Sequence, residues 1–541
     1  MTQEAPAFFT LDRGTVSTTA ALVAPVDGRY RMLATATAPA AVEPDSMLED
    51  LAWRVARTDA SVAGSMEDWR GWSRLEVGTT RAPRAVLVAA SVETGALLER
   101  AFTAAGWIVE ARFFGLEPGF VDLGEACLSP AVDAVVVGGR ERVEDEEREA
   151  AHRLWTRVAS LARFRDDLAV VAAGPFAERP EGLPDGRLFS LPAPQAVHAT
   201  AESTLRQAAG QIGRHLALEG QAAATDARSA LRASIISLAA VLGASVDGLE
   251  VGMAAGSRTM AAGHGEQGHG IFAAAGSTPA ALLTDDELGE VTLNWCTLGG
   301  ADPAARLDSL RELVIHPWAS QGPEGPLFRL AALRAALERL EHAWRPDEAG
   351  AATEPAADVR VLSGGAFAGL PPAAAAIAVL DGVRRPGALS ILHDHAGVLA
   401  PLGALPVEAD RQRLLSDLVA DILLPLGSAV VTGTMETPKK DRASASMSVA
   451  SALGDQRLRL EPGQLQLVDL PPGVSARLGI DPGDGRLLGV EGRTLTMEVN
   501  GGLGGLFVDT RPIPLDLPAS GEARRSALAA WEAMAWTGSE R

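Results

Sequence analysis

The sequence contains little cysteine. Its 541 residues include only Cys127 and Cys296, which lie far apart and form no C-x-x-C pair. So few thiols exclude a secreted scaffold held together by disulfides, and their spacing excludes a cysteine-rich zinc or redox motif. We therefore expect a protein of the reducing cytoplasm.

Positive charge is also scarce relative to negative charge. The chain carries 48 Lys and Arg residues against 69 Asp and Glu residues, which gives a formal net charge of −21. A surface with this excess of acid repels phosphate backbones and anionic lipid headgroups. The composition therefore predicts neither nucleic acid nor a membrane as a partner.

Long hydrophobic runs are missing as well. The longer apolar stretches, such as 233–246, contain serines and are too short to span a bilayer, and residues 1–6 show no basic or apolar signal-peptide region. We expect a protein that is neither secreted nor membrane-spanning. The chain is nevertheless 47% hydrophobic over 541 residues, which is enough for about three or four domain-sized cores.

The first 40 residues have the pattern of a three-stranded antiparallel sheet. Segments 7–12 and 17–23 are rich in apolar and β-branched residues, and 30–38 alternates apolar with polar residues. Asp27-Gly28 between the last two segments is a strong hairpin signal. We therefore predict strand, strand and hairpin partner in that order.

Alternating helix and strand patterns follow this sheet and are typical of an α/β domain. Short apolar runs of the kind that form central strands alternate with segments of helical periodicity. They are a helix over 46–57, strands over 85–90, 133–137 and 168–173, and a helix that ends at 161.

The second half of the chain repeats the opening. Segment 249–257 aligns with 11–19, which places Glu250 over Asp12 and a glycine over a glycine. Each copy continues into a strand, a turn and another strand, so the chain is predicted to contain two similar lobes. The strand 358–362 with its following glycine pair is expected to correspond to 133–139.

The C-terminal part has a different pattern. From 456 onward short strands alternate with turn glycines and prolines, and a helix is predicted over 522–536. We therefore expect a first lobe over 1–230, a second lobe over 231–455 and a small β-rich domain with a terminal helix over 456–541.

The first copy of the repeat has the parts of a phosphate site. Asp12 ends a buried strand, and Gly14, Thr15, Thr18 and Thr19 follow in the turn and the next strand. Backbone N–H groups and hydroxyls can face phosphates there, while the acid orders the water shell of Mg²⁺. A single motif of this kind is most often only a turn, so the interpretation depends on the repeat.

With these motifs the chain resembles the actin-like ATPase superfamily of actin, Hsp70 chaperones and sugar kinases. Within it, the chain is similar to the glutamate mutase L family, the MutL-type accessory proteins encoded beside cobalamin-dependent mutases. The resemblance depends on the order of several segments and covers most of the chain. Besides the repeat, they are 293–317, 326–340, 361–382, 392–405 and 501–511.

The resemblance implies an α/β actin-like ATPase fold, in which two RNase H-like lobes close on ATP and Mg²⁺. Asp12 would hold the metal through water, and Gly364 with Gly365 would approach the adenosine. The implied role is a reactivating or assembly chaperone, whose protein partner is a coenzyme B12-dependent aminomutase of the glutamate mutase type.

The second phosphate loop departs from the family pattern. Glu250, Gly252, Gly256 and Ser257 match it, whereas the paired threonines and the second acid of the relatives are missing. Because phosphoryl transfer depends on positioning and electrostatic stabilisation, this loss puts hydrolysis in doubt more than binding.

Three functions therefore stay open at this point. The chain is an ATPase with Asp12 and Glu250 as its catalytic acids, a pseudo-ATPase that serves as an interaction scaffold, or a small-molecule kinase. The kinase is disfavoured because the cleft motifs offer no convincing second catalytic acid.

Most of the other candidate site residues are expected to have structural roles. His264, Glu266 and His269 are expected at a solvated hairpin tip, and 393–395 (His-Asp-His) in a turn, because adjacent strand residues point to opposite faces. Cys296 is expected to be a buried structural thiol. Three neighbouring tryptophans are a candidate partner surface, namely Trp53, Trp69 and Trp72.

Overall fold

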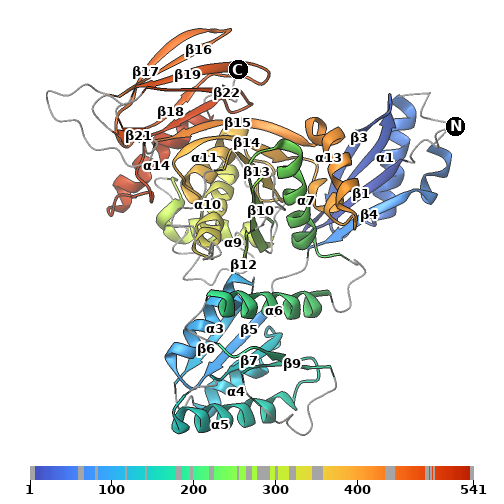
Figure 1. Ribbon diagram of the computed structural model, residues 1–541, viewed down its shortest axis with the longest axis vertical. Helices are drawn as coiled ribbons and strands as arrows, with labels where there is room; N and C mark the ends of the chain where they lie inside the picture. Colours follow the sequence, from blue (N-terminus) through green and yellow to red (C-terminus); the bar gives the residue numbers. More distant parts are fainter. Residues whose placement is uncertain are drawn as a thin grey trace.

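The computed structural model describes most of the chain, in nineteen stretches and at Phe176. They are residues 7–58, 66–79, 83–105, 107–115, 119–140, 143–174, 186–194, 199–218, 225–252, 255–263, 271–276, 293–298, 302–315, 324–343, 357–432, 445–481, 486–487, 490–491 and 494–536. Figure 1 shows their arrangement around several separate sheets.

The N-terminal sheet forms as the sequence predicts. β1 (Phe8–Arg13), β2 (Ser17–Val26) and β3 (Arg29–Pro39) are antiparallel neighbours, and β4 (Ser73–Gly78) adds to the free edge of β1 in parallel. Asp27 and Gly28 have φ angles of 50° and 79°, which is the left-handed geometry of a tight hairpin turn. The predicted helix is α1 (Pro44–Thr58), whose apolar face packs on this sheet.

The central sheet repeats this arrangement. β10 (Val246–Val251), β11 (Ala255–Ala261) and β12 (Ile271–Gly276) are antiparallel neighbours, and β13 (Val359–Ser363) adds to β10 in parallel. β14 (Gly387–Asp394) then adds to β13 in parallel. The order β12-β11-β10-β13-β14, with one antiparallel strand inside, is that of an RNase H-like lobe.

The two hairpins share one register. Asp12 lies opposite Thr19 in the first, and Glu250 lies opposite Ser257 in the second. These are the residues that the sequence alignment superposes, so the predicted repeat is confirmed at the level of individual pairs.

The prediction that segment 133–139 is the counterpart of β13 is wrong. In the register of the two sheets β13 corresponds to β4, because Val77 lies beside Asp12 as Ser363 lies beside Glu250. Strand β4 has the sequence SRLEVG and is largely exposed at its start, so it lacks the apolar pattern that marks a central strand.

Segment 133–139 belongs to another sheet. β5 (Arg84–Ala89), β6 (Ile108–Phe114), β7 (Ala134–Gly138), β8 (Ala169–Ala173) and β9 (Leu188–Leu191) are parallel in the order β6-β5-β7-β8-β9.

Helices lie on both faces of this parallel sheet. α3 (Val92–Ala104) packs against α6 (Ala199–Leu218), and α4 (Phe120–Leu128) packs against α5 (Asp145–Ala162). Two separate cores flank the strands. The unit lies at the lower end of the molecule in Figure 1, so the range 1–230, expected as one lobe, contains two sheets.

The chain enters and leaves this parallel unit at one point. Gly78 at the end of β4 forms a parallel bridge with Asp226, and its N–H donates to Thr225 O over 3.0 Å. Because the two ends lie side by side, the unit is an insertion that leaves the first sheet and the following helix α7 (Ala227–Leu242) in contact.

The C-terminal segment is shared between two sheets. β15 (Leu423–Val431), β23 (Leu506–Asp509) and β18 (Leu465–Val468) extend the central sheet beyond β14. A second sheet in the order β17-β16-β19-β22 covers them, as the upper part of Figure 1 shows. Its strands are β16 (Ser446–Ser451), β17 (Gly454–Arg459), β19 (Ser475–Asp481) and β22 (Leu495–Asn500).

Two helices and a short strand pair complete the C-terminal part. The predicted terminal helix is α14 (Gly521–Trp536), which packs against α11 (Pro372–Gly382) of the second lobe. β20 (Arg486–Leu487) and β21 (Val490–Glu491) form a separate antiparallel pair. Residues predicted as a C-terminal domain thus share a sheet and a helix contact with the second lobe.

A common core joins the two lobes. Phe8, Val23 and Val77 of the first sheet pack with α7 and with two helices of the second lobe, α12 (Leu399–Gly403) and α13 (Glu408–Ile422). At the rim, Arg31 on β3 donates two hydrogen bonds of 2.7 and 2.6 Å to Asp421 on α13. The ends of β1 and β14 therefore meet across this interface.

None of the described helices is both long and apolar enough to serve as a membrane span.

Candidate functional site

Three acids converge where strands of the two lobes end; Glu250 and Asp394 are buried and Asp12 is partly exposed. Asp12 lies near the end of β1, Glu250 near the end of β10 and Asp394 at the end of β14. In open α/β sheets the carboxyl ends of parallel strands are where ligands bind. Gly397, three residues after β14, also comes close, since a Cβ there would lie 3.6 Å from Asp12 Oδ2.

The surroundings of Asp12 disfavour the ionised form of its carboxyl group. Burial, and then the charges of Glu250 and Asp394, raise the pKa of its carboxyl to about 8. Its Oδ1 is buried and has no hydrogen-bond partner among the described residues. A buried oxygen without a partner is costly, so this atom is one that a bound cation or donor would satisfy.

Glu250 is satisfied within the protein. Its Oε2 accepts a hydrogen bond of 2.7 Å from Ser257 Oγ on the neighbouring strand. Burial raises the pKa of Glu250, whereas this bond and the charge of Arg228 lower it. Arg228 and its neighbour Asp226 lie at the start of α7, so α7 contributes charges to the same site.

Asp394 has a structural task as well. It accepts hydrogen bonds from the N–H groups of Val398 and Leu399 at 3.0 and 3.1 Å and from Ser363 Oγ at 3.3 Å. Burial raises its pKa to about 6 against these bonds. The sequence analysis placed Asp394 in a turn and missed its position in the site. No helix-start signal marks it, because α12 begins five residues later at Leu399 and its N-cap is Val398.

The histidines beside Asp394 point elsewhere. Burial lowers the pKa of His393 to about 4, and its ring packs against Phe367. His395 Nδ1 lies 3.0 Å from Ile422 O on α13. Within the part of the chain that the structure describes, no group of three His, Cys, Asp or Glu side chains has metal-ligand geometry.

The first phosphate loop has a tight turn. The N–H of Gly14 donates to Ser17 O over 2.8 Å, and a Cβ on Gly14 would lie only 2.8 Å from that oxygen. Thr15 is exposed at the turn and Thr18 is buried. Thr19 lies opposite Asp12 and is 3.3 Å from Thr37 Oγ1. Since neighbouring strand residues face opposite sides, Thr18 and Thr19 do not share a face.

The second loop is partly described. Gly252 follows β10 and is partly exposed, and a Cβ on Gly256 would lie 3.1 Å from Glu250 O. Residues 253 and 254 lie outside the described residues. Ser257 is buried and directed at Glu250. The hydroxyl that occupies the register position of Thr19 is thus engaged by the acid of the same hairpin.

The glycine pair after β13 reaches the end of β10. Gly364 has φ +99°, and a Cβ there would lie 2.5 Å from Val251 O. That position requires glycine, because the φ is left-handed and the approach is backbone to backbone. Gly365 has open space around its Cα, and the N–H of Ala366 donates to Val251 O over 3.0 Å.

The remaining candidates lie apart from this site. His264, Glu266 and His269 lie outside the described residues. Cys296 is buried and burial raises its pKa, which disfavours the reactive thiolate. Trp69 and Trp72 pack on Phe9 in the first-lobe core. Of the three tryptophans proposed as a partner surface only Trp53 is prominently exposed, at 59%.

The donors of the site fit Mg²⁺ held through water better than by direct ligation. The charges of Glu250 and Asp394 act on Asp12, whose buried Oδ1 has no described partner. The three acids nevertheless form no direct ligand cluster among the described residues. Mg²⁺ keeps several of its waters and is commonly bound through one or two carboxylates together with phosphates. That Asp12 holds Mg²⁺ through water stays a prediction.

Comparisons with known proteins identify no family for this chain. No family model matches the chain, and no curated protein matches it in sequence. Solved structures with a related arrangement exist at 10–12% identity. They are nucleotide-free acetone carboxylase (10% identity, 84% of this chain and 80% of that chain, TM-score 0.31), xylulose kinase from Lactobacillus acidophilus (11%, 75% and 92%, TM-score 0.26) and ATP-dependent caprolactamase from Pseudomonas jessenii (12%, 84% and 81%, TM-score 0.28).

The chain has an actin-like ATPase fold. The repeated β-hairpin with its parallel neighbour and the inter-lobe position of the acids establish this independently of the comparisons. At the identities and TM-scores above, the likeness says nothing about activity. What this actin-like chain does depends on its own residues.

Proposed function

We propose that this protein binds ATP with Mg²⁺ between its two actin-like lobes. The observation that carries the proposal is the buried Oδ1 of Asp12, which lacks a described partner and faces the charges of Glu250 and Asp394. Three neighbouring acids repel one another, and a hydrated divalent cation would remove that repulsion.

Each part of the site has a distinct task in this proposal. Asp12 releases its proton and accepts hydrogen bonds from the water shell of the metal, which supplies charge for the phosphates. Gly14 closes the tight turn through its bond to Ser17 O, Thr15 offers a hydroxyl to the phosphates, and Thr19 lies opposite Asp12 on β2. Gly364 lets the loop approach the end of β10, and Gly365 leaves room for the adenosine.

We further propose that the bound nucleotide controls a protein partner. The motifs shared with the glutamate mutase L family suggest a reactivating or assembly chaperone for a coenzyme B12-dependent aminomutase. A nucleotide between the lobes favours the closed arrangement, and the partner must bind the closed and open arrangements with different affinity for this to have an effect. The proposal includes no cobalamin site in this chain.

The second candidate is a pseudo-ATPase that binds nucleotide without turnover. The bond from Ser257 to Glu250 favours it, because the hydroxyl at the register position of Thr19 already serves the acid and is not free for a phosphate. Without the threonine pair of relatives, stabilisation of the transferring phosphate is reduced. This protein would then act as a nucleotide-dependent scaffold.

The test is a titration of labelled ATP with and without Mg²⁺ against the native chain and Asp12→Asn. We expect saturable, Mg²⁺-dependent binding by the native chain and loss of the Mg²⁺ dependence in the variant. Equal affinities would refute the assigned role of Asp12. Phosphate release, measured with the native partner present, then separates an ATPase from a pseudo-ATPase.

A further inference from the structure

A pocket of about 380 Å³ lies in the second lobe, and Asp12, Glu250 and Asp394 are not among its lining residues. It is bounded by α10 (Gly325–Ala343), the end of α11, the segment after β23 and the start of α14. The volume is in the range of small-molecule sites, which begins at about 300 Å³. Nothing in the proposed nucleotide function uses this pocket.

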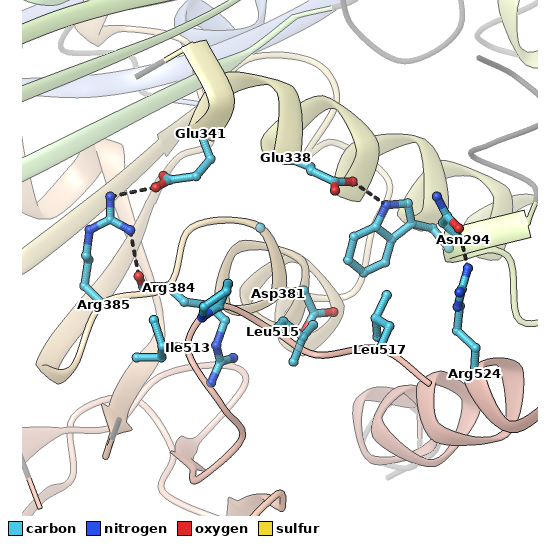
Figure 2. A pocket seen from close by; sticks show the side chains of 13 residues that line it. Asn294, Glu338, Glu341, Asp381, Arg384, Arg385, Ile513, Leu515, Leu517 and Arg524 are labelled. Atoms are coloured by element: carbon cyan, nitrogen blue, oxygen red, sulfur yellow. Dashed lines mark hydrogen bonds and ion pairs between the residues drawn. The ribbon is translucent and has the colours of Figure 1, made fainter. Parts of the chain in front are cut away.

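The pocket has an acidic side and an apolar side. Figure 2 shows Glu338 and Glu341 on one side and Ile513, Leu515 and Leu517 on the opposite side. The apolar residues come from the segment that follows β23. A ligand that fills the pocket therefore contacts charge and aliphatic surface at the same time.

Most of the charges around the pocket are already paired inside the protein. Glu341 accepts from Arg385 at 2.6 Å and from Arg258 at 3.0 Å. Asp381 accepts from two buried guanidinium groups, each at 2.7 Å, and Arg384 is held by both oxygens of Asp509 at 2.7 and 3.0 Å. These groups are fixed, and breaking such buried pairs is costly.

Two charged groups differ from the rest. Glu338 accepts from the indole Nε1 of Trp295 at 3.0 Å, and Arg524 donates to Asn294 Oδ1 and to Pro518 O, the latter at 3.0 Å. Within the described part of the chain, neither has an ion-pair partner. The residues that hold them, Asn294 and Trp295, are adjacent in sequence, so one short segment positions both charges.

The nearby end of α14 adds to the effect of Arg524. This residue lies in the first turn of the helix, where the N–H groups and the helix dipole favour an anion. Glu338 lies on α10, with Trp295 between it and that end. The pocket thus offers one acceptor for a cation and one donor group for an anion, with aliphatic surface facing them.

We propose that this pocket binds a small zwitterion, namely an α-amino acid with an apolar side chain. Its ammonium group pairs with Glu338, its carboxylate pairs with Arg524, and its side chain packs on Leu515 and Leu517. A purely anionic ligand such as a nucleotide would meet Glu338 and Glu341, and a purely cationic ligand would leave Arg524 unpaired. Charge-assisted hydrogen bonds at both ends give the site its specificity.

The test is calorimetric titration of the full-length chain with L-leucine, L-isoleucine, L-methionine and L-phenylalanine. At least one should bind in the micromolar to millimolar range. Two analogues of L-leucine test its charged groups: 4-methylpentanoate lacks the ammonium group, and 3-methylbutylamine lacks the carboxylate. Each should bind at least about tenfold more weakly than L-leucine, which is a loss of about 1.4 kcal/mol in binding free energy. If any other member is the binder, its own deaminated and decarboxylated analogues are used.

Two charge-neutral variants assign the ends of the ligand. Glu338→Gln should lower the affinity for the amino acid about tenfold and leave the affinity for the deaminated analogue unchanged. Arg524→Gln should also lower the affinity for the amino acid about tenfold, but leave the affinity for the decarboxylated analogue unchanged. Arg525→Gln, one residue further along α14 and outside the pocket lining, is the matched control. Leu517→Trp should remove binding by filling the pocket.

The outcomes are decisive in both directions. No heat with any of the four amino acids up to about 10 mM, a limit of about 2.7 kcal/mol in binding free energy, would overturn the proposal, as would equal binding of the analogues. Unchanged affinity in both charge variants would overturn it too. Asp12→Asn should leave amino-acid binding intact, so failure of the nucleotide proposal and failure of this one are distinguishable.

Discussion

The first and second hairpins of this protein have the same backbone and different chemistry. Asp12 and Thr19 occupy the register positions that Glu250 and Ser257 occupy in the second lobe. In the first hairpin the acid has a buried oxygen without a described partner, whereas in the second the acid is bound by its neighbour's hydroxyl at 2.7 Å. Duplication of a fold therefore preserves where an acid lies but not whether it is available to a ligand.

The largest effect is expected from removing the available acid. Asp12→Asn should weaken Mg²⁺-dependent nucleotide binding about 100-fold, or about 2.7 kcal/mol. Glu250→Gln should cost only about tenfold, because Glu250 is already hydrogen-bonded by the protein. Titrations with labelled ATP in Mg²⁺ and in EDTA measure both. A larger loss in Glu250→Gln would reverse the assignment of the two hairpins.

The glycine that packs on the second hairpin comes next. Gly364→Ala should destabilise the protein by about 1–3 kcal/mol, because the φ of +99° and the approach to Val251 O leave no room for a Cβ. Chemical denaturation measures this change.

Gly365→Ala is the matched control for that variant. Its Cα has open space and no left-handed φ, so its stability should stay within about 0.5 kcal/mol of the native chain. Any change of nucleotide affinity in Gly365→Ala would then report on the adenosine contact alone. Equal destabilisation by the two alanines would contradict the described approach to β10.

The pH dependence of binding sharpens the contrast further. Burial, Glu250 and Asp394 raise the pKa of Asp12 to about 8, so the free site must lose a proton before it can hold a cation. The affinity of the protein for the Mg²⁺–nucleotide complex should rise about tenfold per pH unit between pH 6 and 8 and then level off. Residual binding by Asp12→Asn should lack this slope.

The same shift predicts the sign for stability without ligand. The folded-state pKa of Asp12 lies above the ordinary aspartate value of 3.8, so its contribution to stability is present at low pH and is lost as the pH rises toward 8. Asp12→Asn should therefore be more stable relative to the native chain at pH 9 than at pH 5. Thermal unfolding at the two pH values checks this, and an opposite order would refute the shift.

The smallest effects are expected from the paired hydroxyls. Ser257→Ala removes the bond to Glu250 and raises the pKa of that carboxyl further, which should change nucleotide affinity by about threefold, or about 0.7 kcal/mol. Thr19→Ala is the matched substitution in the first hairpin and should weaken binding by a similar factor. A larger effect of Thr19→Ala would mean that its hydroxyl contacts a phosphate.

Much of the architecture was predictable from local pattern. The opening hairpin, α1, the strands β5, β7 and β8 and the terminal helix all lie where apolar periodicity and turn residues place them. Two of the missed strands have weak patterns, β4 with its charged residues and β6 with alternating partial exposure. Such edge positions bury one face at most, so their sequences resemble loops.

The candidate site was predictable only in part. Asp12 and Glu250 were found because the chain repeats a local motif, and the same motif located Gly14 and Ser257. Asp394 was missed because its importance comes from its charge beside Asp12, which lies more than 380 residues away in the chain. No local spacing contains that information.

The amino-acid sequence by itself determined the repeated hairpins, the position of the two acids and the loss of the threonine pair, because these depend on residues within a few positions of one another. The tertiary structure decided which acid is left without a partner, that a parallel sheet is inserted between β4 and α7, and that Glu338 and Arg524 come to line one pocket. Burial and charge are properties of what surrounds a side chain, and the surroundings are assembled from distant segments.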